Sequence, residues 1–205
     1  LADLTKPEYK GLLVVENPAS SSPGLAFLIA TIGVFGEDGD AEYSYLDYWA
    51  GLRANDVLVV DGWDTAYYNE FSGGAGSEGI RPIVVSYATS PAAEVYFSEG
   101  ELTEPPTGTV TMPGTCFRQI EFAGILKGAE NRDLAEAFIE FLLSADFQAD
   151  IPLQMWVFPA NPNVALPQVF VEFALEATHP AEVPADAIEA NREQWIDAWA
   201  DVVLR

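Results

Sequence analysis

The sequence of 205 residues contains one cysteine, Cys116, and one histidine, His179. A disulfide framework within the chain therefore cannot form, and the usual cysteine and histidine ligands of a zinc site cannot be assembled. Cys116 is expected to be a small buried side chain, with a reactive thiol as the alternative. We predict no metal site and no cofactor.

Basic residues are scarce too, with 9 Lys plus Arg against 32 Asp plus Glu and a formal net charge of −23. A chain with so few cations cannot neutralise a phosphate backbone, which argues against nucleic acid as a partner. Attachment to an anionic membrane surface is disfavoured for the same reason. Solubility accounts for the acidity, and steering of a cationic solute is the alternative.

Long apolar runs are also absent. No run approaches the roughly 18 apolar residues of a membrane-spanning helix. Residues 1–6 lack the charged and apolar regions of a signal peptide. The hydrophobic content of 49% is nevertheless enough to form a sizeable core.

What the sequence does contain is an alternation of strands and helices over residues 11–90. Pro23 suits the first helical position of one helix, and Ser22 before it suits the N-cap. This order predicts an α/β domain with a largely parallel sheet. The predicted strands cover residues 10–16, 57–60 and 82–87, and the predicted helices cover residues 23–35, 41–54 and 64–71.

The second half of the chain is predicted to be looser. Residues 98–114 are rich in Thr, Pro, Gly and Glu, which indicates a loop with one edge strand at 109–112. Residues 117–126 are expected to be extended. Asn131 is placed to cap an amphipathic helix over 134–143, Ser144 to cap a second one, and residues 184–204 are predicted to form a long final helix.

Motifs for catalysis find little support. Residues 74–79 match G-x-G-x-x-G, but a dinucleotide site needs a strand before this motif and a helix after it, and the predicted order is the reverse. Nothing local supports a dyad of Cys116 and His179. The acidic cluster of Asp38, Asp40 and Glu42 lacks a completed calcium loop, so a solvated turn is favoured. We therefore predict that the protein is not an enzyme.

Residues suited to binding follow three predicted strands. The serine loop, residues 20–22, lies between a strand and a helix, where N–H groups, hydroxyls and the positive helix end suit an anion or a polar ligand. Capping of the helix alone is the other interpretation of these serines. Trp63 follows the second strand, and Tyr87 follows the third. Because ligands collect at the carboxyl edge of open α/β sheets, we predict a binding site there.

Several segments together resemble the thiamine-binding proteins of ABC transporters. They include Asn-Pro at 17–18, Ser-Ser-Ser-Pro-Gly-Leu at 20–25, Gly-Trp at 62–63, Ser-Tyr-Ala-Thr-Ser-Pro-Ala at 86–92 and Trp-Val-Phe-Pro at 156–159. The resemblance covers nearly the whole chain. Its most specific element is Ser-Tyr-x-Thr-Ser-Pro.

The resemblance implies a type II periplasmic-binding-protein fold of the α/β class, with most of the first lobe absent from this chain. Residues 1–112 would form the second lobe, and residues 113–205 would form crossover and return segments that partly belong to the first lobe. The protein would be extracytoplasmic, in the periplasm or at the cell surface, with a lipid anchor on a preceding segment as one form. It would deliver thiamine or a thiamine phosphate to an ABC transporter permease by cleft closure.

Carried over by position, the resemblance implies ligand contacts from Ser21, Ser22, Trp63, Tyr87 and Trp156. The serine loop, Trp63 and Tyr87 would meet the phosphate or hydroxyethyl end, and Trp156 would lie beside the rings. The family carries a stacking aromatic where this chain has Ala93. A different solute, such as a polyamine or another organic ion, therefore stays open. An enzyme acting on phosphate esters and a structural secreted domain are the rivals from other classes.

Overall fold

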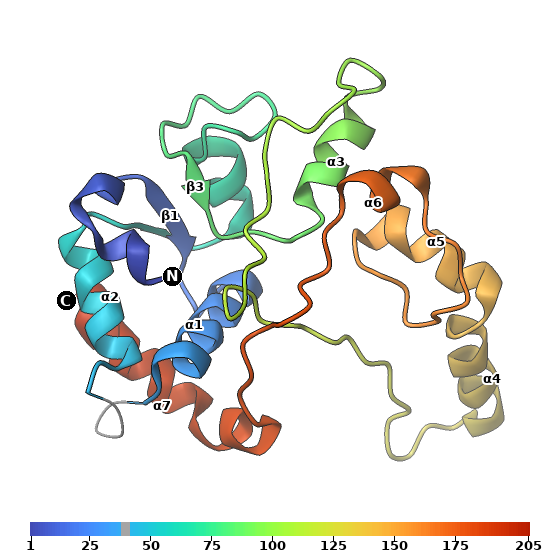
Figure 1. Cartoon of the computed structure of the whole chain (residues 1–205). Coiled ribbons are helices and arrows are strands. Elements are labelled where there is room, and N and C mark those ends of the chain that lie inside the picture. The colour runs from blue at the N-terminus through green and yellow to red at the C-terminus, as the bar shows by residue number, and fades with distance from the viewer. Residues whose placement is uncertain (38–41) are drawn as a thin grey trace. The chain divides into compact units, whose positions relative to one another are not determined.

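A computed structural model of the protein describes residues 1–37 and 42–205, which form two compact units (Figure 1). Unit 1 comprises Leu1–Ala88, Thr107–Arg118 and Glu176–Arg205, and unit 2 comprises Thr89–Pro106 and Gln119–Leu175. Unit 1 contains η1 (Ala2–Thr5), η2 (Pro7–Tyr9), β1 (Leu13–Glu16), α1 (Ser22–Phe35), α2 (Tyr45–Ala54), β2 (Leu58–Val60), η3 (Thr65–Glu70), β3 (Ile83–Val84) and α7 (Ala185–Val203). Unit 2 contains α3 (Ser90–Phe97), α4 (Arg132–Leu142), α5 (Ala145–Met155) and α6 (Gln168–Phe173). Across these described residues, no helix combines the length and the apolar character that crossing a membrane requires.

The sheet of unit 1 is parallel, with strand order β2-β1-β3. Val14 of β1 is paired with Leu58 on one side and with Val84 on the other. All four residues of β1 are buried, as expected of a middle strand with both faces covered. The predicted parallel sheet is confirmed.

Side chains of β1 alternate between two apolar clusters. Leu13 and Val15 face the larger cluster, which contains Trp49 and Trp199 and is formed by α1, α2 and α7. Val14 faces the smaller cluster with Tyr67 of η3. This alternation follows from the two-residue period of a strand, and Figure 1 shows α1, α2 and α7 gathered beside β1.

Helix α1 begins one residue earlier than predicted. Ser21, not Ser22, is the N-cap: its backbone is extended, and its carbonyl accepts the first helical hydrogen bond from the N–H of Leu25, at 2.9 Å. Ser22 is instead the first helical residue. Gly24 lets this turn approach the end of β1, because a Cβ there would lie 2.5 Å from the carbonyl oxygen of Glu16.

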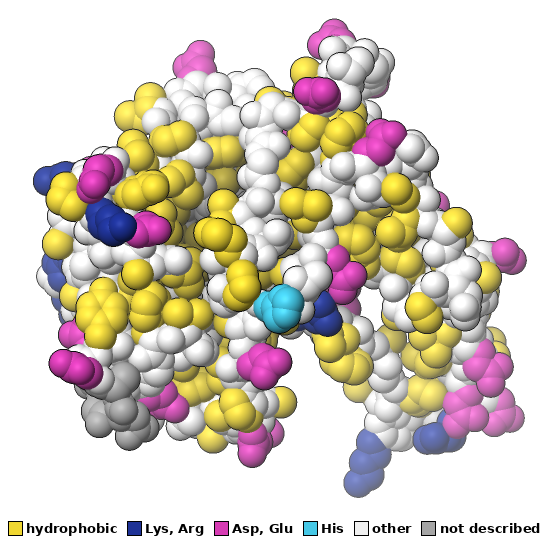
Figure 2. Space-filling view, viewed as in Figure 1, with side chains coloured by type: hydrophobic (Ala, Val, Ile, Leu, Met, Phe, Trp, Pro, Cys, Tyr) yellow, Lys and Arg dark blue, Asp and Glu magenta, His cyan; other side chains and the backbone are white. Residues whose placement is uncertain are grey.

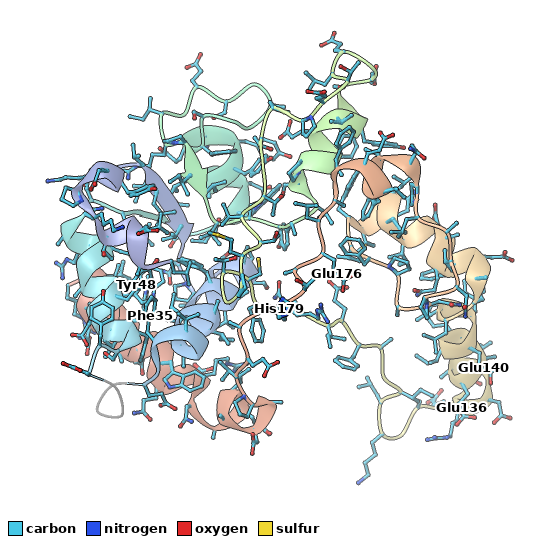
Figure 3. All side chains as sticks on the ribbon, in the orientation of Figure 1. Phe35, Tyr48, Glu136, Glu140, Glu176 and His179 are labelled. Carbon is cyan, nitrogen blue, oxygen red and sulfur yellow. The ribbon has the colours of Figure 1, made fainter. Side chains whose placement is uncertain are left out.

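Helix α2 begins with a capping box. The Ser44 hydroxyl accepts from the N–H of Asp47, and the Asp47 carboxylate accepts from the N–H of Ser44. The predicted start at residue 41 lies outside the described residues, as do Asp38 and Asp40 of the acidic cluster. Tyr48 stacks on Phe35 with 4.6 Å between ring centroids (Figure 3).

Helix α7 closes the core of unit 1, as predicted for residues 184–204. Trp199 packs edge-on against Trp49 at 5.5 Å, and Trp49 donates its indole N–H to Thr31 Oγ1 at 3.0 Å. The guanidinium of Arg53 on α2 donates to the carbonyl of Val202 at 2.6 Å. These contacts attach the C-terminal helix to the N-terminal half of the chain.

In unit 2, the predicted helices α4 and α5 are present, and Ser144 caps α5 by accepting from the N–H of Phe147. Helix α4 buries none of its residues. Leu134, Phe138 and Phe141 along its apolar side are 71%, 55% and 52% exposed. Figure 2 shows hydrophobic side chains open to solvent over α4 and α5, and Figure 3 shows Glu136 and Glu140 on α4.

Two features differ from the sequence prediction. The prediction of an edge strand at 109–112 is wrong, because the structure has no strand there. Val110 is exposed, and its carbonyl accepts a hydrogen bond from the Thr115 hydroxyl rather than from a neighbouring strand. Helices α3 and α6 were not predicted. They pack against each other within unit 2.

Candidate functional site

Three loops of unit 1 meet at the carboxyl edge of the sheet. After β1, the N–H of Asn17 donates to the carbonyl of Val60 at 2.7 Å, which extends the pairing with β2. The Ser20 hydroxyl donates to the carbonyl of Asp61 at 2.8 Å. These two bonds fix the serine loop beside the segment that carries Trp63.

The serine loop leaves the hydroxyls of Ser21 and Ser22 available, while that of Ser20 is bonded to Asp61. Ser21 is half-buried and, although it is the N-cap, its side chain makes no capping hydrogen bond. Ser22 is exposed. Pro23 contributes no N–H, so the donors at this helix end are the N–H groups of neighbouring residues and the serine hydroxyls. Simple capping therefore does not account for Ser21.

Trp63 lies at the centre of an aromatic corner, which we define as Trp63, Tyr67, Tyr68 and Tyr87. Its ring stacks on Tyr67 at 4.9 Å, meets Tyr68 edge-on at 5.4 Å and lies 5.8 Å from Tyr87. Its indole N–H donates to Ser86 Oγ at 2.8 Å. The structure thus brings Trp63 and Tyr87 together, and Tyr87 is 42% exposed.

Tyr67 and Tyr68 were missed by the sequence prediction. They lie on η3, which follows Trp63 directly, so the signal was an aromatic pair about one helical turn beyond a predicted site residue. Glu16 was missed as well. It ends β1 with none of its side chain exposed, and both carboxyl oxygens lack a hydrogen-bond partner among the described residues. Burial raises the pKa of Glu16 to about 8.

Trp156 belongs to unit 2, at the end of α5. Its backbone is left-handed, with φ 56° and ψ 34°, a conformation that a bulky residue adopts only when its surroundings hold it there. Its carbonyl accepts from the hydroxyl of buried Thr89 at 2.7 Å. The ring stacks on Phe170 at 5.7 Å and meets Tyr96 at 5.4 Å. Thr89 in the Ser-Tyr-x-Thr-Ser-Pro motif thus fixes the Trp156 backbone.

The glycines of residues 74–79 have a packing role. A Cβ on Gly74 would lie 2.2 Å from the carbonyl oxygen of Tyr67, and one on Gly79 would lie 2.2 Å from the carbonyl carbon of Glu70. Both glycines therefore permit the loop to lie against the backbone of η3. The helix precedes the motif, as predicted, which is the wrong order for a dinucleotide site.

Other parts of the described chain are weaker candidates for a functional site. Among residues 1–37 and 42–205, no group of three or more His, Cys, Asp or Glu side chains is placed to hold a metal ion. His179 contacts the Thr178 hydroxyl at 2.9 Å, and Cys116 contacts the Val110 carbonyl at 3.5 Å. A hollow of about 420 Å³ is lined by Phe117, Arg118 and residues 180–184. The guanidinium of Arg118 already donates to Glu176 and to the carbonyl of Ala177. The aromatic corner, together with the serine loop, is therefore the better candidate for a binding site.

Comparison with known proteins places this architecture among solute-binding proteins. A family model described as a bacterial extracellular solute-binding protein matches residues 1–188. The thiamine-binding periplasmic proteins of Escherichia coli and Salmonella typhimurium are 29% and 30% identical, each covering 100% of this chain. The chain spans 57% of the length of each of these relatives. Both are named as binding proteins rather than enzymes.

A solved structure gives the same result for the fold. That of a periplasmic thiamin binding protein superposes with a TM-score of 0.74 at 26% identity, covering 100% of this chain and 59% of that chain. The predicted fold and the predicted resemblance are thereby confirmed. The assignment of residues 1–112 and 113–205 to lobes, and the ligand roles of Ser21, Ser22, Trp63, Tyr87 and Trp156, stay predictions.

Proposed function

The chain belongs to the bacterial extracellular solute-binding protein family, and from that premise we propose that it binds thiamine or a thiamine phosphate outside the cytoplasm, for delivery to an ABC importer. It acts by binding and not by catalysis. The relatives with thiamine-binding names, aligned over the whole of this chain, support the choice of solute.

The observation that carries the proposal is the aromatic corner beside the N-terminus of α1. Trp63 and Tyr87 offer ring faces to a planar heterocycle. The uncapped hydroxyl of Ser21, with Ser22 and the positive end of a 14-residue helix, suits a phosphate or hydroxyl group. Thiamine and its phosphates combine these two chemistries in one molecule. Trp156 would supply a further aromatic contact beside the rings.

The whole protein would work by cleft closure, in which two lobes trap the solute and the closed form is recognised by the permease. Residues 1–112 would belong to the second lobe, and residues 113–205 partly to the first. The exposed apolar side of α4 supports this assignment, because a helix with Leu134, Phe138 and Phe141 open to water requires a covering partner. The first lobe would provide that cover.

A second candidate solute is a polyamine or another small organic cation. Ala93 stands where a stacking aromatic is expected for thiamine, and the net charge of −23 favours a cationic solute. A polyamine has no ring to stack, but its ammonium groups can lie over the faces of Trp63 and Tyr87, so a titration with each solute distinguishes the two candidates.

The proposal is tested by titrating the full-length protein with thiamine, thiamine monophosphate and thiamine diphosphate while tryptophan fluorescence is recorded. We expect saturable quenching at micromolar concentrations or below. Tyr87→Ala should weaken binding about 10-fold, corresponding to about 1.4 kcal/mol for a lost aromatic contact. Trp63→Ala should weaken it as well.

Tyr43→Ala is the matched control, because Tyr43 is 45% exposed, close to the value for Tyr87, and contacts Phe35 away from the strand ends. If both tyrosine variants weakened thiamine binding equally, the proposed location of the site at the aromatic corner would be wrong. If the folded protein binds none of the three thiamine compounds but binds spermidine, the second candidate solute is correct and thiamine is not.

A further inference from the structure

Glu16, the last residue of β1, is a buried titratable side chain. None of it is exposed, and neither carboxyl oxygen has a hydrogen-bond partner among the described residues. A buried carboxyl that lacks a partner is costly when charged, and burial accordingly raises its pKa to about 8, with a smaller opposing effect from its own backbone N–H. At neutral pH the group therefore holds a proton.

Its position is set by the sheet. Strand alternation puts Glu16 on the same face as Val14, and pairing puts it level with Val60. Trp63 follows β2, and Ser86, its hydrogen-bond partner, follows β3. Because β1 lies between β2 and β3, the bond from Trp63 to Ser86 spans the end of β1. The buried carboxyl of Glu16 therefore lies on the face of the sheet where Trp63 and Tyr67 pack.

Charged neighbours do not account for the protonated state. Burial raises the pKa, the backbone N–H of Glu16 itself lowers it by a smaller amount, and no other charge contributes. Helix α1 has no acidic residue in its first turn. Arg81 contacts the carbonyl of Leu13, at the opposite end of β1. The remaining titratable groups on the elements around Glu16 are Asp61 and Asp64 after β2, Tyr67, Tyr68 and Glu70 on η3, and Tyr87 after β3.

We propose that Glu16 is the charge-selecting residue of this site: it releases its proton to solvent when an organic cation occupies the aromatic corner, so that the site exchanges a proton for a cationic solute. This inference rests on the proposed function, since thiamine carries a quaternary nitrogen. The charge balance is one proton out for one cation in. The negative charge develops on Glu16 at the end of β1, and the cation lies among the rings of the aromatic corner.

The physical basis is the attraction between the cation and a carboxylate in a site of low dielectric constant. An aromatic face attracts a cation, and an opposite charge nearby lowers the pKa of a carboxyl by about 1–3. A fall of about 1–2 from the starting value of about 8 would make affinity rise about 5-fold to 25-fold between pH 6 and pH 8. At pH 7, binding would release about 0.4–0.8 protons per solute.

The experiment is calorimetric titration of the full-length protein with thiamine at pH 7, in phosphate and in Tris, whose different ionisation enthalpies report the number of protons released. Affinity is then measured at pH 6, 7 and 8. Thiamine is used rather than its phosphates, because a phosphate group has its own ionisation with a pKa of about 6. Glu16→Gln keeps the shape and removes the proton, so it should bind without proton release and without pH dependence.

Glu8→Gln is the matched control, because Glu8 is exposed on η2 before the other end of β1. It should behave as the unmodified protein. Proton-free, pH-independent binding by the unmodified protein overturns the inference and leaves the proposed function standing. Unchanged proton release by Glu16→Gln also overturns it. Absence of thiamine binding overturns the proposed function and this inference together. Should Glu16→Gln fail to fold, the proton count of the unmodified protein decides alone.

Discussion

Protonation of Glu16 in the folded state should make the stability of unit 1 depend on pH in a direction opposite to that of most carboxyl groups. The ordinary pKa of 4.5 applies to the unfolded chain, and burial raises the pKa to about 8 in the folded one. Between these values the folded state binds one more proton than the unfolded state. The free energy of unfolding therefore falls as pH rises.

The size of this effect follows from the two pKa values. The contribution is fully present below pH 4.5 and is lost at about 1.4 kcal/mol per pH unit until pH approaches 8. Between pH 5.5 and pH 7.5 the protein should lose about 2.5 kcal/mol of stability from Glu16. Glu16→Gln, which has no proton to lose, should lack this component.

Urea unfolding at pH 5.5, 6.5 and 7.5 measures the effect, with the fluorescence of Trp49 and Trp199 as the signal, since both are buried in the core of unit 1. The quantity of interest is the stability difference between the unmodified protein and Glu16→Gln at each pH. A difference that stays constant across the three pH values would show that Glu16 is already ionised in the folded protein, and the reasoning from its burial would be refuted.

Two further predictions concern stability. Thr89→Val should destabilise unit 2 by about 1–3 kcal/mol, because the carbonyl of Trp156 loses the hydroxyl that donates to it at 2.7 Å. Thr89→Ser keeps a hydroxyl and should retain most of the stability. Urea unfolding and near-UV circular dichroism measure both variants, and equal stability of the two would contradict the prediction. Gly24→Ala should cost about 1–3 kcal/mol in thermal unfolding, because its Cβ would lie 2.5 Å from the carbonyl oxygen of Glu16. Gly108→Ala, with no atom within 4 Å of the added Cβ, is its control, and similar costs for the two would argue against tight packing at α1.

The strand and helix order of unit 1 could be predicted because its signals are local. Short apolar runs predict β1 and β2, and Pro23 predicts the start of α1 to within one residue. The ends of the strands bring Trp63 and Tyr87 together. Parallel strands necessarily place their carboxyl ends at one edge, so the meeting of these two side chains follows from topology.

The features that were missed depend on contacts between distant segments. Helices α3 and α6 are short, and they pack against each other across a long separation in sequence. The left-handed backbone of Trp156 is held by Thr89, 67 residues earlier in the chain. Glu16 is buried in a folded sheet in which the segments after the two neighbouring strands are joined by the bond from Trp63 to Ser86. Neither composition nor periodicity contains this information.

The discontinuity of unit 1 has a consequence for biosynthesis. Its core needs Trp195 and Trp199 from the last segment, which lies after the whole of unit 2 in the chain. A ribosome that has reached Arg118 has produced β1, β2 and β3 but not α7, so Trp49 and Leu52 still lack the side chains of α7 that pack on them. Unit 1 therefore cannot complete its folding during translation of unit 2. The core of unit 1 is therefore expected to form only after α7 has been synthesised.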